Sequence, residues 1–419
     1  VTTNSQKIAV TKADGTTELY VEVDEWDNAT QTGVLHVSKS DWTINADTVI
    51  YLYYDNSKDN NTTYIGLVPG SSPATSVWDS SYQGVYHLKE DPSGTAPQIK
   101  DSTSNARNLT SNGTMASGDL VAGKVGRAID FDGSDDYVEL ATAADIGLTN
   151  AWTFEAWQYM DTNGDDESSV SIHQGVGAGN NNFVWAFRQY LTKTCVNPSA
   201  FKSDASGYLV DFPGVDNNLS TGVWGHFIVT YDGTTVRLYK NGAADNYATA
   251  SGSQTNTNRK ICIGALASNG GHVPFDGLVD EVRISSVGRS VAWVKGTYNS
   301  GLDGLLAYGT EESPAGTTTS TTTTTSSSTT TTVTTTSSST TLSTSTTVTT
   351  TSSSTSTTVT TTSSSTTLTS STTLTTTSSS TTLSTSTTVT TTSSSTTLTE
   401  TTTSTTTTIT TTSSSTTLS

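Results

Sequence analysis

Two short runs, Arg127–Phe131 and Tyr137–Leu140, alternate apolar and polar residues on either side of an acidic turn that contains Gly133. Alternation with a period of two is typical of a strand that buries one face. A turn of Gly, Asp and Ser between two such runs is typical of a hairpin. We therefore predict a β-hairpin over residues 127–140.

The same pattern recurs along the first 310 residues, where short apolar runs alternate with turn residues. Many short strands with almost no helical periodicity predict an all-β fold, an antiparallel β-sandwich. One short helix is expected over Ser290–Thr297, where Val291, Val294 and Lys295 recur at helical spacing. The other predicted strands are Glu18–Val23, Gly33–Val37, Thr48–Tyr54, Trp152–Met160, Phe183–Tyr190, Val223–Tyr231, Val236–Tyr239, Lys260–Gly264 and Leu278–Ile284.

Changes in composition divide the chain into four segments. Residues 1–68 hold a partial N-terminal β unit, residues 69–77 form a linker rich in Pro, Gly and Ser, and residues 78–310 hold the main β domain. Residues 311–419 form a repeat tail of Ser and Thr, in which only Glu400 and eleven Val, Leu or Ile residues interrupt the stretch after residue 316. So few apolar residues cannot bury enough surface to offset the conformational entropy of the chain, so we expect the tail to be non-globular.

The apolar residues of the tail recur regularly, and eight of the ten intervals between them are 9 or 6 residues. A polyproline II helix has three residues per turn, so these intervals keep the apolar residues on one side of it. This spacing favours an extended, O-glycosylated, mucin-like stalk. Two alternatives stay open. Expansion of a 15-codon DNA repeat yields the same spacing without selection on geometry, and packing in a polymer would make the tail the core of a fibre.

The formal net charge is −19, and the last basic residue is Lys295. The negative charge therefore lies on the part of the chain before the tail, which disfavours nucleic acid as a partner and is compatible with divalent cations. No run of about 20 apolar residues is present, so no membrane span is expected in this chain. Cys195 and Cys262 form no C-x-x-C pair; one disulfide and two unpaired thiols both remain open.

Five motifs, in order along the chain, resemble those of laminin G / concanavalin A-like jelly-roll domains. They are Gly126–Val138, Trp152–Trp157, Trp224–Gly233, Val236–Gly242 and Phe275–Ile284. The resemblance implies a jelly-roll sandwich over residues 78–310. The fold hosts lectins, adhesion modules, spacers and a few enzymes, so it does not decide the function.

The N-terminal segment has a resemblance of its own. Ile50–Asn56 is similar to the last strand of an uncharacterised prokaryotic surface domain, which typically reads I-Y-L-Y-Y-G-N, with Asp55 where that family has Gly. The resemblance implies that residues 1–68 are the C-terminal part of such a domain.

The acidic turn is a candidate calcium site, because carboxylates on loops offer the hard oxygen ligands that calcium takes. Asp132 and Asp135 lie on this turn. The laminin G-like resemblance points to Asp132 together with Asp280. The alternative is structural, with Asp132 forming the turn and Asp280 capping a loop or pairing with Arg283.

A second candidate calcium loop is formed by Asp161, Asn163 and Asp165, which fit the first half of an EF-hand loop. The loop lacks Gly at its sixth position, and Ile172 stands where the bidentate Glu belongs. A solvent-facing acidic loop is the alternative.

Carbohydrate binding would use aromatic side chains with amides nearby. The candidates are Trp185, Tyr190, Tyr208 and Asn181, and core packing of Trp185 is the alternative. Sequons for N-glycosylation begin at Asn28, Asn60, Asn61, Asn108, Asn112 and Asn218.

Catalytic motifs are weak in this sequence. Glu22–Asp27 resembles the E-x-D-x-x-E strand of jelly-roll glucanases, but Asp27 stands at its last position. We assign no catalytic residue and expect an extracellular, non-catalytic adhesion or carbohydrate-binding protein on a glycosylated stalk, with a glycan or surface protein as partner. The first alternative is a structural subunit of an extracellular filament that self-assembles through the tail, and a glycoside hydrolase is a distant second.

Overall fold

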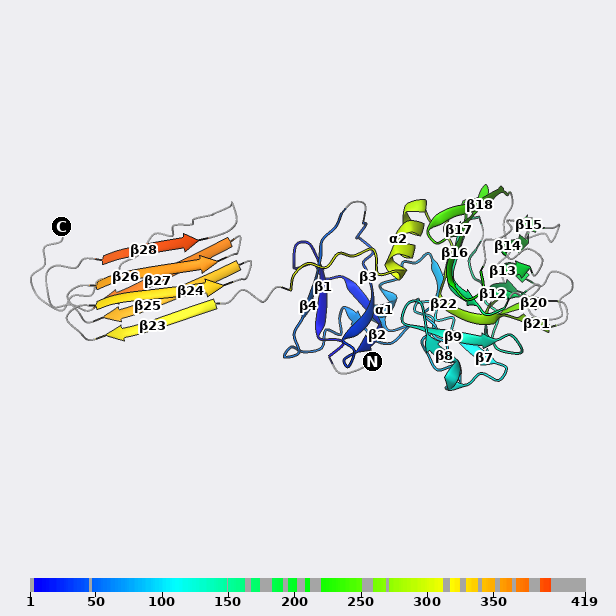
Figure 1. Ribbon diagram of the computed structural model, residues 1–419, viewed down its shortest axis with the longest axis horizontal. Coiled ribbons are helices and arrows are strands. Elements are labelled where there is room, and N and C mark those ends of the chain that lie inside the picture. Colours follow the sequence, from blue (N-terminus) through cyan, green and yellow to red (C-terminus); the bar gives the residue numbers. More distant parts are fainter. Residues whose placement is uncertain are drawn as a thin grey trace, which may run out of the picture. The chain divides into compact units, whose positions relative to one another are not determined.

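The structure is a computed structural model in which two compact units form, Val1–Ala307 and Tyr308–Ser419. We call the first unit the head and the second the tail. The described residues of the head are 4–44, 47–148, 150–162, 167–173, 183–190, 195–201, 208–211, 220–250, 259–268 and 271–307. Those of the tail are 308–311 and six strands between residues 317 and 392 (Figure 1).

The first part of the head is a small β unit with its own core. β1 (Ile8–Lys12) pairs antiparallel with β4 (Ile50–Tyr54), while β2 (Tyr20–Asp27) lies between β3 (Thr32–Ser38) and β5 (Ile65–Gly66). Alternate residues of these strands meet in an apolar cluster formed by Ile8, Val10, Leu19, Val21, Val23 and Ile65. A short helix, α1 (Ser72–Thr75), follows within the expected linker, with Pro73 in its first turn.

The main domain of the head is a sandwich of two antiparallel sheets, which confirms the predicted all-β jelly roll. The eight-stranded sheet has the order β18-β17-β16-β11-β22-β9-β8, with β6 also paired to β22. Its strands are β6 (Tyr82–Tyr86), β8 (Leu120–Ala122), β9 (Arg127–Asp132), β11 (Trp152–Met160), β16 (Trp224–Tyr231), β17 (Thr235–Lys240), β18 (Ala243–Thr249) and β22 (Asp276–Ser285).

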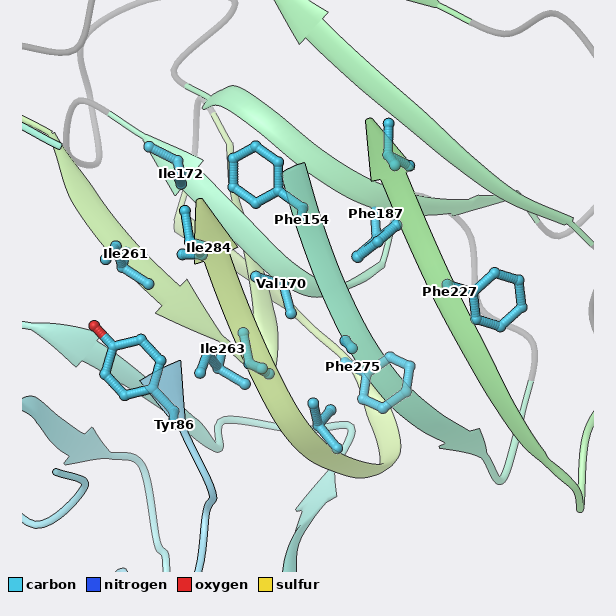
Figure 2. Close-up of a cluster of buried hydrophobic side chains, with 14 of the residues drawn as sticks. Tyr86, Phe154, Val170, Ile172, Phe187, Phe227, Ile261, Ile263, Phe275 and Ile284 are labelled. Atoms are coloured by element: carbon cyan, nitrogen blue, oxygen red, sulfur yellow. The ribbon is translucent and has the colours of Figure 1, made fainter. Parts of the chain in front are cut away.

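The seven-stranded sheet has the order β15-β14-β13-β12-β19-β10-β7. Its strands are β7 (Leu109–Asn112), β10 (Tyr137–Leu140), β12 (Ser168–His173), β13 (Phe183–Tyr190), β14 (Cys195–Phe201), β15 (Tyr208–Asp211) and β19 (Lys260–Ile263). The two sheets bury one core, and Figure 2 shows Phe154 and Ile284 from the eight-stranded sheet beside Val170, Ile172 and Ile263 from the seven-stranded one.

The predicted hairpin at residues 127–140 is wrong, because β9 and β10 belong to different sheets. β9 pairs with β8 and β22, while β10 pairs with β7 and β19. The turn between them crosses from one layer of the sandwich to the other. The alternation of apolar and polar residues does not distinguish a hairpin within one sheet from a connection between two sheets, because Phe131 and Val138 both point into the same core.

Three smaller elements complete the sandwich. Helix α2 (Val291–Gly301) overlaps the predicted helix, and the Ser290 hydroxyl caps it by accepting a hydrogen bond from the Trp293 amide. A hairpin of β20 (Ala265–Ser268) and β21 (Gly271–Pro274) follows β19 directly. A 3-10 helix, η1 (Ser117–Asp119), precedes β8.

The tail contains parallel strands, which differs from the expected polyproline II stalk. β23 (Thr317–Thr324), β25 (Thr341–Thr350) and β27 (Thr367–Thr376) form one sheet; β24 (Thr329–Ser337), β26 (Thr355–Ser363) and β28 (Thr385–Thr392) form the other. Successive strands therefore alternate between two parallel sheets (Figure 1). β-Branched Thr favours strands over other conformations, which gives a physical reason for this difference.

Candidate functional site

A polar cluster lies on the outer face of the seven-stranded sheet. In its central strands, Val138, Ile172 and Ile263 alternate into the core, so their neighbours point to the opposite face. The strand register places Glu139 of β10 opposite Cys262 of β19. The same register places residues of β12 beside β19, with Ser171 opposite Cys262 and His173 opposite Lys260.

Glu139 is the centre of this cluster. Its Oε1 accepts a hydrogen bond from Nζ of Lys260 at 2.5 Å. Its Oε2 lies 2.8 Å from Nε2 of His173 and 3.2 Å from Nε2 of His272. His272 comes from the β20–β21 hairpin, which is held against this face by the hydrogen bond from the Ser171 hydroxyl to the Ala265 carbonyl.

Burial and charge set the ionisation of the cluster. Burial raises the pKa of Glu139, but the contacts with His173, His272 and Lys260 outweigh it, so this pKa lies well below its usual value. Desolvation lowers the pKa of His173, so its imidazole is neutral near pH 7. Burial also raises the pKa of the Cys262 thiol well above its usual value. The cluster thus combines an ionised carboxylate, a neutral imidazole and a protonated thiol.

Solvent reaches one side of the cluster. The side chains of Lys260 and His272 are 25% and 12% exposed, while that of His173 is fully buried. The ring of half-buried Tyr137 stacks on His272 with centroids 4.0 Å apart. An aromatic surface therefore adjoins charged groups at the face of the sheet, and this arrangement suits a polar ligand with apolar patches.

This cluster was not among the sites predicted from the sequence. Its residues come from three separate segments of the chain, β10, β12 and β19–β21, and the order of strands in a sheet cannot be read from alternation. The local signal is the two-residue spacing of Tyr137 with Glu139 and of Lys260 with Cys262, which puts each pair on one face of a strand.

The predicted carbohydrate-binding residues belong to the same seven-stranded sheet. Trp185 pairs with Ile172, Tyr190 pairs with Cys195, and Tyr208 pairs with Phe201. For Trp185, Tyr190 and Tyr208 the structure describes the backbone alone, and Asn181 lies outside the described residues.

The two predicted calcium loops meet at one rim of the sandwich, around Asp276. This residue lies opposite Asp132 in the β22–β9 register, and its carbonyl accepts a hydrogen bond from the Asp161 amide at 3.1 Å. The acidic groups of Asp132, Asp135 and Asp136 each place an oxygen within 4.8 Å of the others. Asn163 and Asp165 of the second loop lie outside the described residues.

Hydrogen bonds also explain the acidic turn without an ion. Oδ1 of Asp132 accepts hydrogen bonds from the amides of Ser134 at 2.8 Å and Asp135 at 3.2 Å. Burial raises the pKa of Asp136 to about 6, and the charge of Asp132 adds to this rise. A carboxyl group of this kind gains from a nearby cation.

Asp280 is not brought together with Asp132. It lies four residues along β22 from Asp276, a separation of about 14 Å in an extended strand, and it is fully buried. Its Oδ2 accepts a hydrogen bond from the Val125 amide at 2.7 Å, so it caps the turn before β9, as the structural alternative expects. The other part of that alternative is wrong, because Arg283 forms its ion pairs with Glu281 and Glu155.

The glucanase-like strand is buried where the N-terminal β unit meets the sandwich. Oε2 of Glu22 accepts a hydrogen bond from the Trp78 indole at 2.6 Å, and its Oε1 accepts one from the Ser102 hydroxyl at 2.6 Å. Asp24 lies 3.2 Å from Nζ of Lys89. Both carboxylates therefore have partners inside the head, and the structure shows them as part of its packing.

Histidine side chains extend this buried network. His36 and His87 stack with ring centroids 4.4 Å apart, and Nδ1 of His87 lies 2.5 Å from Oε1 of Glu281. Charge from Glu281, Asp24 and Glu22 outweighs the burial of His87 and raises its pKa well above the usual value. We call these side chains the junction network; its members are Glu22, Asp24, His36, His87, Lys89, Glu281 and Arg283.

The remaining predicted sites are partly described. Cys262 is a free, buried thiol, and the side chain of Cys195 lies outside the described residues. Among the sequon residues, Asn28 and Asn60 are exposed, while Asn61, Asn108 and Asn112 are half-buried. Asn218 lies outside the described residues. No helix in the described part of the chain is long and apolar enough to cross a membrane.

Residues 132–295 match the Laminin_G_3 family, described as the concanavalin A-like lectin/glucanases superfamily. A search among curated proteins found no match. Matching solved structures include domain 4 of AbnA, a GH43 extracellular arabinanase from Geobacillus stearothermophilus, in complex with arabinotriose. It has 19% identity and a TM-score of 0.35, and the match covers 51% of this chain and 97% of that one.

Two further matches are the binding domain of Paraclostridial Mosquitocidal Protein 1 and the ligand-binding domain of botulinum neurotoxin serotype D with N-acetylneuraminic acid. The first has 14% identity and a TM-score of 0.37, and covers 52% of each chain. The second has 13% identity and a TM-score of 0.35, and covers 52% of this chain and 51% of that one. The family match confirms the laminin G / concanavalin A-like resemblance for residues 132–295. The resemblance of the N-terminal unit and the mucin-like character of the tail stay predictions.

Proposed function

We propose that this protein is an extracellular, non-catalytic binding protein whose head takes a glycan on the outer face of the seven-stranded sheet. The observation that carries the proposal is the stacked pair of Tyr137 and His272 beside the ionised Glu139 and Lys260. An aromatic face contacts the apolar side of a sugar ring, while a carboxylate and an ammonium group bond its hydroxyls. Burial of Glu22 and Asp24 in the junction network supports a non-catalytic function.

Glycan binding is tested with the purified head on a glycan array, followed by titration of the best ligand. We expect Tyr137→Ala to weaken binding by about tenfold, which corresponds to about 1.4 kcal/mol. Tyr247→Ala is the matched control, because Tyr247 is 72% exposed on β18 of the other sheet. Absence of any bound glycan, or equal losses in both variants, overturns the proposal.

Calcium at the rim of the sandwich remains a separate proposal, supported by the clustered oxygens of Asp132, Asp135 and Asp136. Isothermal titration with Ca²⁺ should show one site that Asp135→Asn weakens. Asp14→Asn is the control, since Asp14 forms an exposed turn with the Thr16 and Thr17 amides in the N-terminal unit. Equal binding by wild type and both variants counts against calcium at this turn.

The extracellular setting is supported by the exposed sequon residues Asn28 and Asn60. Intact-mass measurement of protein purified from its source should show glycan attached to the head and O-linked glycan on the tail. An unmodified mass contradicts the glycosylated stalk.

A structural subunit of an extracellular filament is the second candidate, favoured by the register of the tail. Parallel pairing aligns Val333 of β24 with Val359 of β26 and Val389 of β28. Aligned identical residues in stacked parallel strands are the pattern by which separate chains also stack. Electron microscopy of the full chain should then show fibres that Thr substitutions at these three positions abolish. Monomers at all concentrations overturn this candidate.

A further inference from the structure

We propose that Glu139, His173, His272 and Cys262 form a binding site for a zinc-class divalent transition-metal ion. This site shares Glu139 and His272 with the proposed glycan face, but the inference depends on the donor atoms of these four side chains and needs no bound glycan. Each offers one ligand atom, and these four atoms all lie within 4.8 Å of one another.

The spacing of the donors fits tetrahedral coordination. Metal–ligand bonds of about 2.1 Å place tetrahedral donors about 3.4 Å apart. Nε2 of His173 lies 2.8 Å from Oε2 of Glu139, and Nε2 of His272 lies 3.2 Å from the same oxygen. An ion inserted among them needs the two nitrogens to move away from this oxygen by about 0.6 and 0.2 Å.

The supporting elements hold most of the donors in place. Glu139, Cys262 and His173 lie on three neighbouring strands in the middle of the seven-stranded sheet. His272 alone comes from the β20–β21 hairpin, which the hydrogen bond from the Ser171 hydroxyl to the Ala265 carbonyl holds against this face. A site built on strands keeps its geometry better than one built on loops.

The choice of donors selects the metal. Two imidazole nitrogens, one carboxylate oxygen and one thiolate sulfur suit zinc and its neighbours in the first transition row. Calcium and magnesium take oxygen ligands, so this set discriminates against both ions. Lys260 bonds Oε1 of Glu139 and leaves Oε2 directed at the two imidazoles.

Protonation makes the binding pH-dependent. Nε2 of His173 lies 2.8 Å from Oε2 of the ionised Glu139, so a neutral imidazole donates its Nε2–H there, and zinc binding at Nε2 requires the tautomer protonated at Nδ1. Cysteine binds zinc as the thiolate, so the metal must displace the proton of the free, buried Cys262 thiol. Zinc binding should therefore release about one proton per chain.

Two other clusters of candidate ligands support the assignment by contrast. In the junction network, Asp24 and Glu281 are neutralised by Lys89 and Arg283, and His87 is protonated against Glu281. An added cation would meet the positive charges of Lys89, Arg283 and His87 there, whereas Lys260 supplies one such charge beside Glu139. The acidic turn offers carboxylate oxygens only, which suit a different class of ion.

The test is a titration of chelator-treated full-length protein with ZnCl₂ by isothermal calorimetry, without any glycan. We expect one zinc per chain, and His272→Ala should reduce the affinity at least about 100-fold, since even partners of metal ligands contribute 10- to 100-fold. His36→Ala is the matched control, because it removes an imidazole from the junction network instead. No binding, or loss with His36→Ala rather than His272→Ala, overturns the site.

Absorption spectroscopy tests whether Cys262 is the fourth ligand. Co²⁺ in the same site should give tetrahedral absorption bands and a thiolate charge-transfer band in the near ultraviolet. Cys262→Ser should remove the thiolate band and the proton release, which calorimetry in buffers of different ionisation enthalpy measures. A wild-type spectrum without that band removes Cys262 from the site.

Folding and glycan binding are separated from metal binding in the same samples. Partly exposed His272 lies in a hairpin, so His272→Ala should keep the thermal unfolding temperature measured in chelator. Zinc should raise that temperature in wild type and not in the variant. Failure of the glycan array leaves these results unaffected, so the two proposals can fail separately.

Discussion

Glu281 links the two β units of the head. Its Oε1 lies 2.5 Å from Nδ1 of His87 and 3.7 Å from Nε2 of His36 on β3. The residue has a left-handed backbone with φ of 50°, where the register between β22 and β11 shifts at a bulge. A left-handed conformation is uncommon for residues other than Gly and is retained where surrounding contacts require it. Here the bulge directs a carboxylate toward the N-terminal unit.

His87→Gln should destabilise the head by about 3 kcal/mol, because it leaves buried carboxylates without their cation. His36→Gln, at a partly exposed imidazole, is the milder comparison. Urea unfolding of both variants measures the difference. Equal, small losses would show that the ion pair of His87 adds little.

The destabilisation of the head by His87→Gln should depend on pH, in the direction set by the pKa shifts of His87 and Glu281. The pKa of His87 is raised above its usual value of about 6.5, so its contribution is complete below about pH 6.5 and is lost as pH rises through the raised pKa. The pKa of Glu281 is lowered below 4.5, so its contribution is present above about pH 4.5 and is lost in acid. The gap between wild type and His87→Gln should be largest near pH 5–6 and smaller in alkali.

Asp280→Asn should stabilise the head increasingly as pH rises from about 4. Burial, the charge of Glu281 and that of Asp24 raise the pKa of Asp280 well above its usual value. A carboxyl group with a raised pKa loses stability as pH rises from its unfolded pKa toward its folded one, and an amide does not titrate. Thermal unfolding between pH 4 and 8 measures the gap, which a constant difference would contradict.

At the scale of strands, the sequence predicted about half of the strands of the head near their observed bounds, and it failed on their partners. Trp152–Met160 and Phe183–Tyr190 match β11 and β13 as predicted. The turn at Gly133 was expected to join paired strands, yet it connects the two sheets. Alternation reports which face of a strand is buried, and both arrangements bury the same residues.

The candidate site was less predictable for a related reason. The site residues predicted from the sequence were Asp132, which lies in a local turn, and aromatic residues of the seven-stranded sheet. Glu139 and His272 meet only because β10, β19, β12 and the following hairpin are neighbours. Contacts between residues so far apart in sequence depend on the topology as a whole.

Gly264→Ala should cost about 2 kcal/mol or more, because Gly264 has φ of 88° and its added Cβ would lie 2.3 Å from the Phe131 ring. This glycine joins β19 to the β20–β21 hairpin, so zinc affinity should fall with stability. Gly118→Ala is the control, since nothing lies within 4 Å of its added Cβ. Denaturant unfolding checks both variants, and equal stabilities contradict the argument.

At the scale of the whole molecule, head and tail are separate compact units. Removing residues 308–419 should therefore leave the thermal unfolding temperature of the head within about 2 °C of the full chain, as for a change of less than 0.5 kcal/mol. Calorimetry of both proteins measures this. A large shift would falsify the independence of the two units.

The register of the tail strands determines how a gain of sequence repeats would change the dimensions of the tail. Paired positions such as Val333 and Val359 are 26 residues apart, while the offset from Val359 to Val389 is 30 residues, so the connecting segments absorb extra residues. Unequal recombination that adds one such repeat would give each sheet one further strand, an increase of about 4.8 Å. An extended polyproline II chain would lengthen by about 80 Å for the same 26 residues. Alleles of different repeat number would thus differ in the thickness of the tail and hardly in its reach.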